Sequence, residues 1–536
     1  MSSLASLSTA CAPSTFASLQ VFATEIRHIE TQLVTNFSAF VPAALRFTQP
    51  TIEFQNATFC NVTVTYTHPG QGDEVFAQAW LPIGNYNGRL QAVGGSGWGA
   101  GGTPLTFETM KGAIGDGYAT ITNDGGLTGD ANDWVLLSPG NVNLYKLNNL
   151  GSVSVNEQSI IGKSLVRSFY GKPPSFSYWN GCSQGGRQGF VVAQRYPSAF
   201  DGISAGAPVI HIPDLIGAVQ WPQQVMNSLG EWPYPCELDA LTLAAISACD
   251  NLDGVLDGIV SDPSGCLHKF NPFSLVGTPI NCTTTNATLP ISLAAANVAN
   301  ATWHGPRSPS GKPLWYGLTP GTDLTGNNPS SGGLPGIAIT NCTSGTCTGI
   351  VNPLSGSYFS LMVAKGFPTF SLSNLTLSEF AALVHAGKQQ YSSFFATDDP
   401  DLSAFRAAGG KMVSFHGTAD QIVSHEGTAR YYRSVQKEGS SGKMGDFWRH
   451  FEVPGLGHCF GGRSGNPEGL WEQLKGWVEE GKAPPGVTGV GVVGLDGTAG
   501  RRVLCAFPGK ARYNKGCGNV KEEKCWECIE GSGKGR

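Results

Sequence analysis

The sequence GCSQG occupies residues 181–185 of this chain. It matches G-x-S-x-G, the sharp strand-to-helix elbow that raises a nucleophilic serine above a sheet. A strand-like run over Ser175–Asn180 precedes it, and a helix-like run over Arg187–Tyr196 follows it. The alternative is a glycine turn with an inert serine, but the flanking runs favour the elbow.

Two cysteines each stand beside a residue with the chemistry of a catalytic group. Cys182 precedes Ser183 and Cys459 follows His458, which lies 275 positions after the serine. A disulfide between these cysteines would hold the two side chains within reach of each other. Since a serine hydroxyl is a poor nucleophile while protonated, it needs such a base nearby. The sequence therefore predicts a serine hydrolase whose nucleophile and base are linked by a disulfide.

The acid of a hydrolase triad is expected between the serine and the histidine in chain order. Asp420 lies in a glycine-containing loop after the strand signal at Met412–Phe415, where it could orient the imidazole and stabilise its charge. His416 in the same loop is expected to be structural. Weaker candidates for acid or base are Asp398, Asp399, Asp401, His425 and His450.

Two backbone N–H groups are needed to stabilise the oxyanion of the tetrahedral intermediate. Gln184 follows the nucleophile and supplies the first. The turn Gly94–Gly97 follows a strand signal at Arg89–Val93 and offers the second, for which Gly95 is our choice. An ordinary glycine turn is the alternative.

The order of these elements predicts an α/β-hydrolase fold. At 536 residues the chain exceeds the usual size of one hydrophobic core. Strand and helix signals alternate over the first ~200 residues and return after residue 411, which favours a sheet with parallel later strands. The signals are strands at Val62–Tyr66, Val75–Leu81, Tyr118–Thr122 and Arg449–Val453, and helices at Val155–Phe169 and Gly427–Gln436.

Residues 212–395 differ in character from the flanking segments. Proline, glycine, asparagine, serine and threonine dominate this part, and strong hydrophobic periodicity is absent. We predict an inserted, disulfide-braced lid domain at 212–395 that carries a calcium site, and a catalytic domain formed by 1–211 and 396–536. The tail after about residue 485 is expected to be held on the body by its disulfides.

Charge and hydropathy exclude two classes of partner. Only 14% of the residues are charged and the net charge is −5, so no basic surface for nucleic acid is expected. No stretch approaches the ~20 apolar residues of a membrane span, so no membrane partner is expected either.

The fourteen cysteines are even in number and scattered, which indicates disulfides in an oxidising compartment. A zinc site formed by Cys505, Cys517, Cys525 and Cys528 is the alternative, although the spacing is not that of a zinc ribbon. Eight Asn-x-Ser/Thr triplets add to a prediction of a secreted glycoprotein. A signal peptide is not evident at the N-terminus. The triplets begin at Asn36, Asn56, Asn61, Asn281, Asn286, Asn300, Asn341 and Asn374.

The run Asp250–Ile259 holds three carboxylates in eight residues. Such a density of oxygen ligands suits calcium, with main-chain carbonyls filling further positions. The spacing is not that of an EF-hand. Two exposed Asp-Gly turns are the alternative, and the spacing alone leaves both readings open.

Five motifs resemble the tannase and feruloyl esterase family of fungal secreted esterases. They are CNVTVTYTHPGQGD (60–73), GCSQGGRQG (181–189), CDNLDGVLDGIVSDPSGC (249–266), HGTADQIV (416–423) and PGLGHC (454–459). The resemblance implies an α/β hydrolase with a large lid, a triad of Ser183, Asp420 and His458, and a bridge between Cys182 and Cys459.

The same resemblance implies a structural calcium in the lid and two further disulfides, Cys11–Cys60 and Cys249–Cys266. The matching calcium ligands are the carboxylates of Asp250, Asp253 and Asp257 and the carbonyls of Val255 and Ile259. No organic cofactor is expected. The other cysteine pairs and the oligomeric state are not assigned by the sequence.

The predicted function is secreted hydrolysis of feruloyl or p-coumaroyl esters of plant cell-wall polysaccharide through an acyl-enzyme. A tannase acting on galloyl esters is the alternative within the family. A lipase or peptidase on the same fold is a further alternative. The non-enzymatic alternative is a catalytically dead, secreted carbohydrate-binding glycoprotein.

Overall fold

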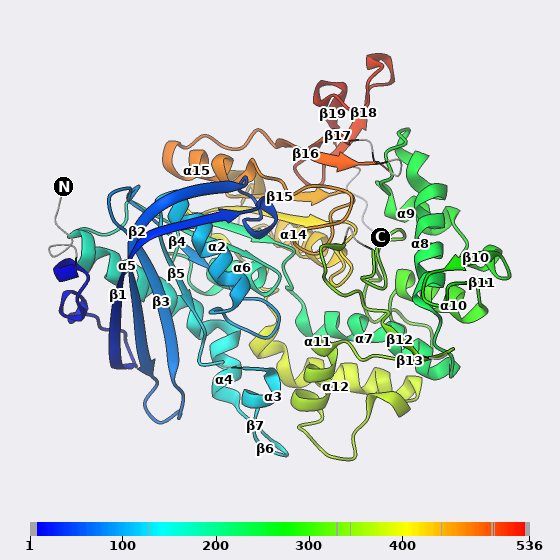
Figure 1. Cartoon of the computed structure of the whole chain (residues 1–536), viewed down its shortest axis with the longest axis horizontal. Coiled ribbons are helices and arrows are strands. Elements are labelled where there is room, and N and C mark those ends of the chain that lie inside the picture. Colours follow the sequence, from blue (N-terminus) through cyan, green and yellow to red (C-terminus); the bar gives the residue numbers. More distant parts are fainter. Residues whose placement is uncertain are drawn as a thin grey trace.

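The structure, a computed structural model, describes residues 8–127, 129–328, 331–343, 345–440, 442–494, 497 and 499–530. Its centre is a nine-stranded sheet with the order β1-β2-β3-β5-β4-β8-β9-β14-β15 (Figure 1). The strands are β1 (Glu25–Val41), β2 (Ile52–Thr67), β3 (Val75–Pro82), β4 (Arg89–Val93), β5 (Ala119–Asn123), β8 (Phe176–Cys182), β9 (Gly202–Gly206), β14 (Lys411–Gly417) and β15 (Trp448–Val453).

The sheet is antiparallel at one end and parallel at the other. β1, β2, β3 and β5 pair antiparallel, whereas β5, β4, β8, β9, β14 and β15 pair parallel. Every residue of β9 is buried, as expected for a central parallel strand covered on both faces. The predicted α/β-hydrolase fold with parallel later strands is therefore confirmed.

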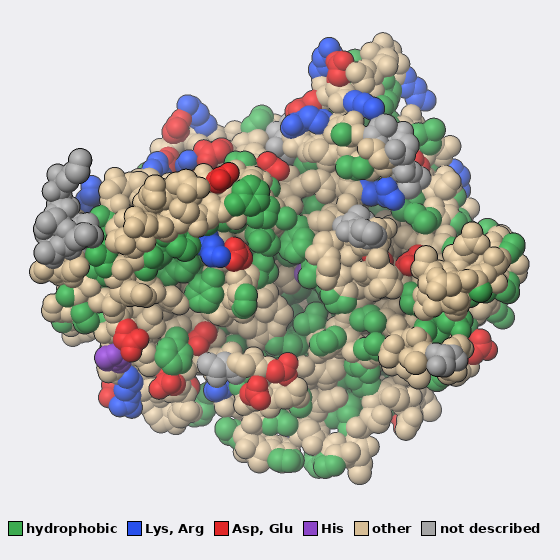
Figure 2. Space-filling model, in the orientation of Figure 1, with side chains coloured by type: hydrophobic (Ala, Val, Ile, Leu, Met, Phe, Trp, Pro, Cys, Tyr) green, Lys and Arg blue, Asp and Glu red, His purple; other side chains and the backbone are tan. Residues whose placement is uncertain are grey.

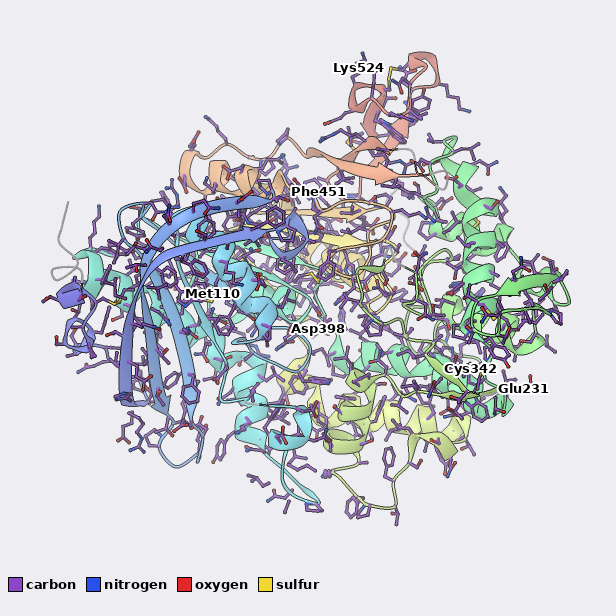
Figure 3. All side chains as sticks on the ribbon, viewed as in Figure 1. Met110, Glu231, Cys342, Asp398, Phe451 and Lys524 are labelled. Carbon is purple, nitrogen blue, oxygen red and sulfur yellow. A yellow bond between two sulfur atoms is a disulfide. The ribbon has the colours of Figure 1, made fainter. Side chains whose placement is uncertain are left out.

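Helices cover both faces of this sheet. Neighbouring residues of β8 show the division, because Trp179 packs in the cluster with α5, α6 and α14, while Tyr178 packs in the cluster with α15. In Figure 3, the label Met110 marks the position of helix α2 and the label Phe451 marks the position of strand β15. The helices are α2 (Pro104–Gly115), α5 (Ser154–Tyr170), α6 (Gln184–Arg195), α14 (Glu426–Glu438) and α15 (Leu470–Glu480).

The segment predicted as a lid contains long helices that were not predicted from its sequence. They are α7 (Ile212–Leu229), α8 (Pro235–Cys249), α10 (Leu293–His304) and α12 (Leu377–Phe395), and they lie to the right of and below the sheet in Figure 1. α7 buries residues around most of its circumference, so it has no one-sided apolar pattern. The two ends of the segment meet where His211 forms an antiparallel bridge with Ala396.

Two small hairpins, here called the C-terminal module, follow the sheet. β16 (Val487–Val493) pairs with β17 (Ala499–Cys505), and β18 (Lys510–Tyr513) pairs with β19 (Trp526–Ile529). The disulfides Cys505–Cys528 and Cys517–Cys525 brace the module. The module stands beside α8 and α9 (Pro263–Lys269) at the top of Figure 1.

All fourteen cysteines are paired in seven disulfides. Three of these join the pairs predicted above, Cys11–Cys60, Cys182–Cys459 and Cys249–Cys266. The pairs that the sequence left unassigned include Cys236–Cys282 and Cys342–Cys347. The alternative of a zinc site is wrong, because its four cysteines are consumed by the bonds of the C-terminal module.

A buried ionic cluster ties the turn after β2 to helix α5. His68 contacts Asp73 through Nδ1 and Glu157 through Nε2, both at 2.6 Å. Tyr66 donates to the same Glu157 at 2.6 Å. The bond to Glu157 and then the bond to Asp73 outweigh burial and raise the pKa of His68 to about 9. The imidazolium therefore neutralises two carboxylates inside the core.

Among the described residues, no helix is long and apolar enough to cross a bilayer. The asparagines of the eight predicted glycosylation triplets are exposed or half-buried. Glycan attachment at these positions stays a prediction.

Candidate active site

Ser183 lies at the turn between β8 and α6. Its backbone has φ 62° and ψ −119°, a strained conformation for a residue with a side chain. The turn is possible because glycines stand two positions before and two positions after Ser183. A Cβ atom on Gly181 would lie 2.6 Å from the backbone of Gly185, so the strand and the helix could not approach as they do. The elbow predicted from the sequence is thus formed at the end of a central parallel strand.

Asp420 lies in the loop after β14 and is 2% exposed. Its Oδ1 accepts the N–H groups of Ile422 at 2.9 Å and Val423 at 2.7 Å, and its Oδ2 contacts Nδ1 of His458 at 2.7 Å. Burial alone would raise the pKa of Asp420. The charge of His458 and the bonds from His416 and His458 outweigh that effect and hold the pKa well below its ordinary value. The side chain is therefore a carboxylate that can orient an imidazole.

His458 follows β15 on a glycine-rich loop. The ring is held through Nδ1 by Asp420, and the main-chain N–H donates to Oε1 of Gln421 at 2.9 Å. With Nδ1 bonded to the carboxylate, Nε2 is the nitrogen left to act as a base. His416, which also contacts Asp420 at 3.2 Å, is fully buried and bonded to Thr428. His416 thus has the structural position expected from the sequence.

The disulfide Cys182–Cys459 joins the elbow to the histidine loop across 277 positions of sequence. The two Cα atoms lie 5.9 Å apart, and both cysteines are almost fully buried. Ser183 and His458 line the same pocket. The structure therefore brings together the three residues that the sequence predicts for the triad.

The oxyanion prediction needs one correction. The N–H of Gly95 donates to Oε1 of Gln188 at 2.8 Å, and its carbonyl accepts the N–H of Gly185 at 2.9 Å. A Cβ atom at this position would lie 2.1 Å from the carbonyl oxygen of Gly99. Gly95 is therefore a packing glycine, and its N–H is engaged inside the protein and is not free to bind an oxyanion.

Ser96 offers the N–H that Gly95 does not. It lines the pocket that contains Ser183. Within the described part of the chain, neither the N–H of Ser96 nor that of Gln184 donates to another protein group. Within the glycine-rich turn, the choice between Gly95 and Ser96 depends on Gln188, a contact between residues 93 positions apart.

Arg187 holds the residues around the elbow in place through hydrogen bonds. This fully buried guanidinium donates to Oε1 of Gln184 at 2.9 Å, the carbonyls of Leu150 at 2.7 Å and Gly151 at 3.1 Å, and Oγ1 of Thr397 at 3.1 Å. Burial, with a smaller contribution from the charge of Arg195, lowers the pKa of Arg187 to about 9. Arg187 thus connects the start of α6 to the segment that returns from the lid.

The pocket around Ser183 has a volume of about 160 Å³. Among the described residues that line it, none is Asp, Glu, Lys or Arg, and His458 is the one ionisable side chain. The hydroxyls of Thr106 and Thr109 in its wall are already bonded to neighbouring protein groups. Its apolar walls are formed by Phe47, Leu105, Leu334, Leu354, Ile422 and Phe460.

A larger pocket of about 260 Å³ lies between the segment predicted as a lid and the loops after β14 and β15. Asp239, Asp323 and Arg463 contribute to its polar walls, and neither Ser183 nor His458 lines it. The reaction site is therefore assigned to the smaller pocket, which contains both reactive side chains.

The acidic loop predicted to bind calcium is closed by bonds within the protein. Asp250 accepts main-chain N–H groups from Asp257, Gly258 and Ile259. Within the described ranges, no group of three or more His, Cys, Asp or Glu side chains is arranged to hold a metal ion. As arranged, the carboxylates do not offer calcium the six to eight oxygen ligands that it takes. The calcium site stays a prediction.

The fold and the reactive groups together define an α/β hydrolase with a serine at its nucleophile elbow. Residues 60–529 match the family described as "Tannase and feruloyl esterase". The chain belongs to this family and is a carboxylic ester hydrolase.

Similar proteins agree with this assignment. The chain is 37% identical over 486 residues to a probable feruloyl esterase of Arthroderma benhamiae, covering 88% of this chain and 86% of that protein. It is 28% identical over 491 residues to feruloyl esterase B of Aspergillus niger, with the same coverage. Among solved structures, the tannin acyl hydrolase of Aspergillus niger has a TM-score of 0.84 at 27% identity, covering 98% of this chain and 96% of that one. Feruloyl esterase B of Aspergillus oryzae has a TM-score of 0.75 at 25% identity, with 97% and 99% covered.

Proposed function

We propose that this chain is a secreted feruloyl esterase that cleaves hydroxycinnamate esters of plant cell-wall polysaccharide. The observation that carries the choice of acyl group is the apolar, uncharged pocket beside Ser183. Secretion is supported by seven disulfides, which form and persist in oxidising compartments.

In the first half of the proposed reaction, Nε2 of His458 takes the hydroxyl proton of Ser183 as Oγ attacks the ester carbonyl carbon. The N–H groups of Gln184 and Ser96 stabilise the resulting oxyanion. When this tetrahedral intermediate collapses, His458 gives the proton to the departing sugar alcohol. The hydroxycinnamoyl group is left as an ester on Ser183.

In the second half, His458 takes a proton from water as the water oxygen attacks the acyl carbon. Collapse of this second intermediate breaks the bond to Oγ, and His458 returns the proton to Ser183. Asp420 stabilises the imidazolium at both stages because it is a buried carboxylate bonded to Nδ1. The products are the free hydroxycinnamic acid and the unmodified enzyme.

The pocket favours a methoxylated phenol over gallate. A galloyl ring carries three hydroxyls, and each one left without a partner in an apolar wall costs about 1–3 kcal/mol. The wall hydroxyls of Thr106 and Thr109 are already bonded within the protein, which leaves the hydroxyl of Ser96 as the other polar side chain beside Ser183 and His458. Ferulate presents one ring hydroxyl in place of three, and its methoxy group adds no donor that an apolar wall would leave unpaired.

The test is a comparison of kcat/KM on methyl ferulate, methyl caffeate, methyl sinapate and methyl gallate. The proposal expects methyl ferulate to exceed methyl gallate by about tenfold or more. The reverse order would identify a tannase, a possibility supported by the similarity to a tannin acyl hydrolase. No turnover of any of the four esters would favour a non-enzymatic protein. The Ser183→Ala variant, with an unchanged melting curve, is the blank for all four measurements.

A further inference from the structure

The acidic loop at Asp250–Ile259 has a partner for nearly every carboxylate oxygen. Asp250 is 4% exposed, and its Oδ1 accepts the N–H groups of Asp257 at 3.1 Å and Ile259 at 3.3 Å. Its Oδ2 accepts the N–H of Gly258 at 2.9 Å. Both carboxylate oxygens of Asp250 therefore bind main-chain N–H groups and close the loop.

The other two carboxylates of the loop face an arginine from the C-terminal module. Asp253 accepts the N–H of Val255 on Oδ1 at 3.0 Å, and its Oδ2 lies 2.5 Å from a terminal nitrogen of Arg502. Oδ2 of Asp257 lies 2.6 Å from Nε of the same guanidinium. Among the described residues, four of the six carboxylate oxygens accept a hydrogen bond, whereas Oδ2 of Asp257 is paired with Arg502 by charge alone and Oδ1 of Asp257 has no donor.

Arg502 is built into this position. It is 4% exposed and also bonds the hydroxyl of Ser261. The ring of Trp526 lies 4.5 Å from the guanidinium carbon, within the range of a cation–π contact. The planar fork of arginine can serve two carboxylates and stack on a ring at once. Figure 2 shows Lys and Arg gathered on the module that supplies this side chain.

The contact also joins two parts of the chain that are far apart in sequence. Val255 at the tip of the loop packs in one cluster with Val503, Cys505 and Trp526 of the C-terminal module. Apolar packing therefore lies beside the ion pairs and limits the access of water to them, which strengthens the attraction between the charges.

We propose that Arg502 is the resident counter-ion of the acidic loop, occupying the place of a divalent cation and fastening the C-terminal module to the lid. A cation entering the loop would meet a guanidinium 2.5 Å and 2.6 Å from two of its three carboxylates. Calcium therefore binds only when Arg502 is removed or displaced. This inference goes beyond the proposed esterase function and does not depend on it.

The test compares Arg502→Met with Arg501→Met in the full-length protein. Methionine keeps most of the apolar stem and deletes the charge. Arg501 is the matched control, because it is the neighbouring residue of the same strand but is 60% exposed and has only a 3.6 Å ion pair with Glu523. Melting curves are recorded in EDTA and in millimolar calcium chloride, and calcium binding is measured by titration calorimetry.

The proposal expects the wild type and Arg501→Met to melt at the same temperature in both buffers. Arg502→Met should melt roughly 3–6 °C lower in EDTA, because two partly buried carboxylates lose their partner, and should recover in calcium. Calorimetry should find one calcium site in Arg502→Met and none in the wild type. If Arg502→Met does not fold, the wild type alone decides the question. A calcium ion retained by the wild type after dialysis, or a calcium-dependent melting temperature, would overturn the proposal.

Discussion

Removal of the Cys182–Cys459 bridge, by the double variant Cys182→Ala with Cys459→Ala, should affect both stability and catalysis. The bond closes a loop of 277 positions. The chain-entropy relation gives about 5–6 kcal/mol for a loop of that length, as an upper value. With an unfolding entropy of about 1 kcal/mol/K for a chain of this size, the melting temperature should fall by about 5 °C.

The activity should also fall strongly, because the loop that carries His458 loses its covalent link to the elbow. A displacement of the base by about 1 Å can cost about 100-fold in kcat. Hydrolysis of methyl ferulate, measured below the lowered melting temperature, gives kcat for the variant and the wild type.

The matched control is Cys342→Ala with Cys347→Ala, which removes a disulfide of the lid hairpin β12 (Thr340–Thr343) and β13 (Thr346–Gly349). This bond spans 5 positions, so the same relation gives only about 2 kcal/mol. Figure 3 shows Cys342 far out on the lid. Its removal should leave kcat unchanged. If kcat is also unchanged in the Cys182 and Cys459 variant, the bridge does not align the nucleophile and the base.

Two further predictions concern buried cations. The pKa of His68 is raised from 6.5 to about 9, so its stabilisation is complete below pH 6.5 and is lost as the pH rises through about 9. The wild-type melting temperature should fall over that range by an amount equivalent to at most about 3 kcal/mol, and the fall should be absent in His68→Gln. An equal fall in both proteins would exclude His68 as its source. Arg187→Met should lower stability by about 2–4 kcal/mol and also reduce kcat, since four buried acceptors lose their donor next to the elbow. The stability and kcat of Arg187→Lys should lie between those of the wild type and of Arg187→Met, because an ammonium has three donors. A wild-type kcat in Arg187→Met would show that the guanidinium does not position the elbow.

The elbow and the triad could be predicted from the sequence because each depends on a short local pattern. Ser183, Asp420 and His458 each lie within five positions after a strand signal, and the carboxyl ends of parallel strands meet at one edge of the sheet. The cysteines beside the serine and the histidine added the pairing. These features required no knowledge of lid packing.

The features that escaped prediction depend on contacts between distant segments. The engagement of Gly95 depends on Gln188, and the neutralisation of the acidic loop depends on Arg502, which lies 249 positions after Asp253. Strand β1 was missed because it is an edge strand of mixed composition with register shifts, so its alternation is interrupted. Helix α7 was missed because burial on several sides removes the amphipathic pattern. Helix α12 buries a single face, so its pattern was present in the sequence and was overlooked.

The central claim is that Ser183 is the nucleophile and is activated by His458. Its most direct test is the reaction of the native protein with a p-nitrophenyl phosphonate, followed by mass spectrometry of the whole chain and of its peptides. In this reaction Oγ forms a bond to phosphorus and nitrophenolate leaves. We expect one adduct per chain, located on Ser183, absent in Ser183→Ala and much slower to form in His458→Ala. A wild-type chain that stays unlabelled while hydrolysing methyl ferulate, or an adduct on a different serine, would contradict it.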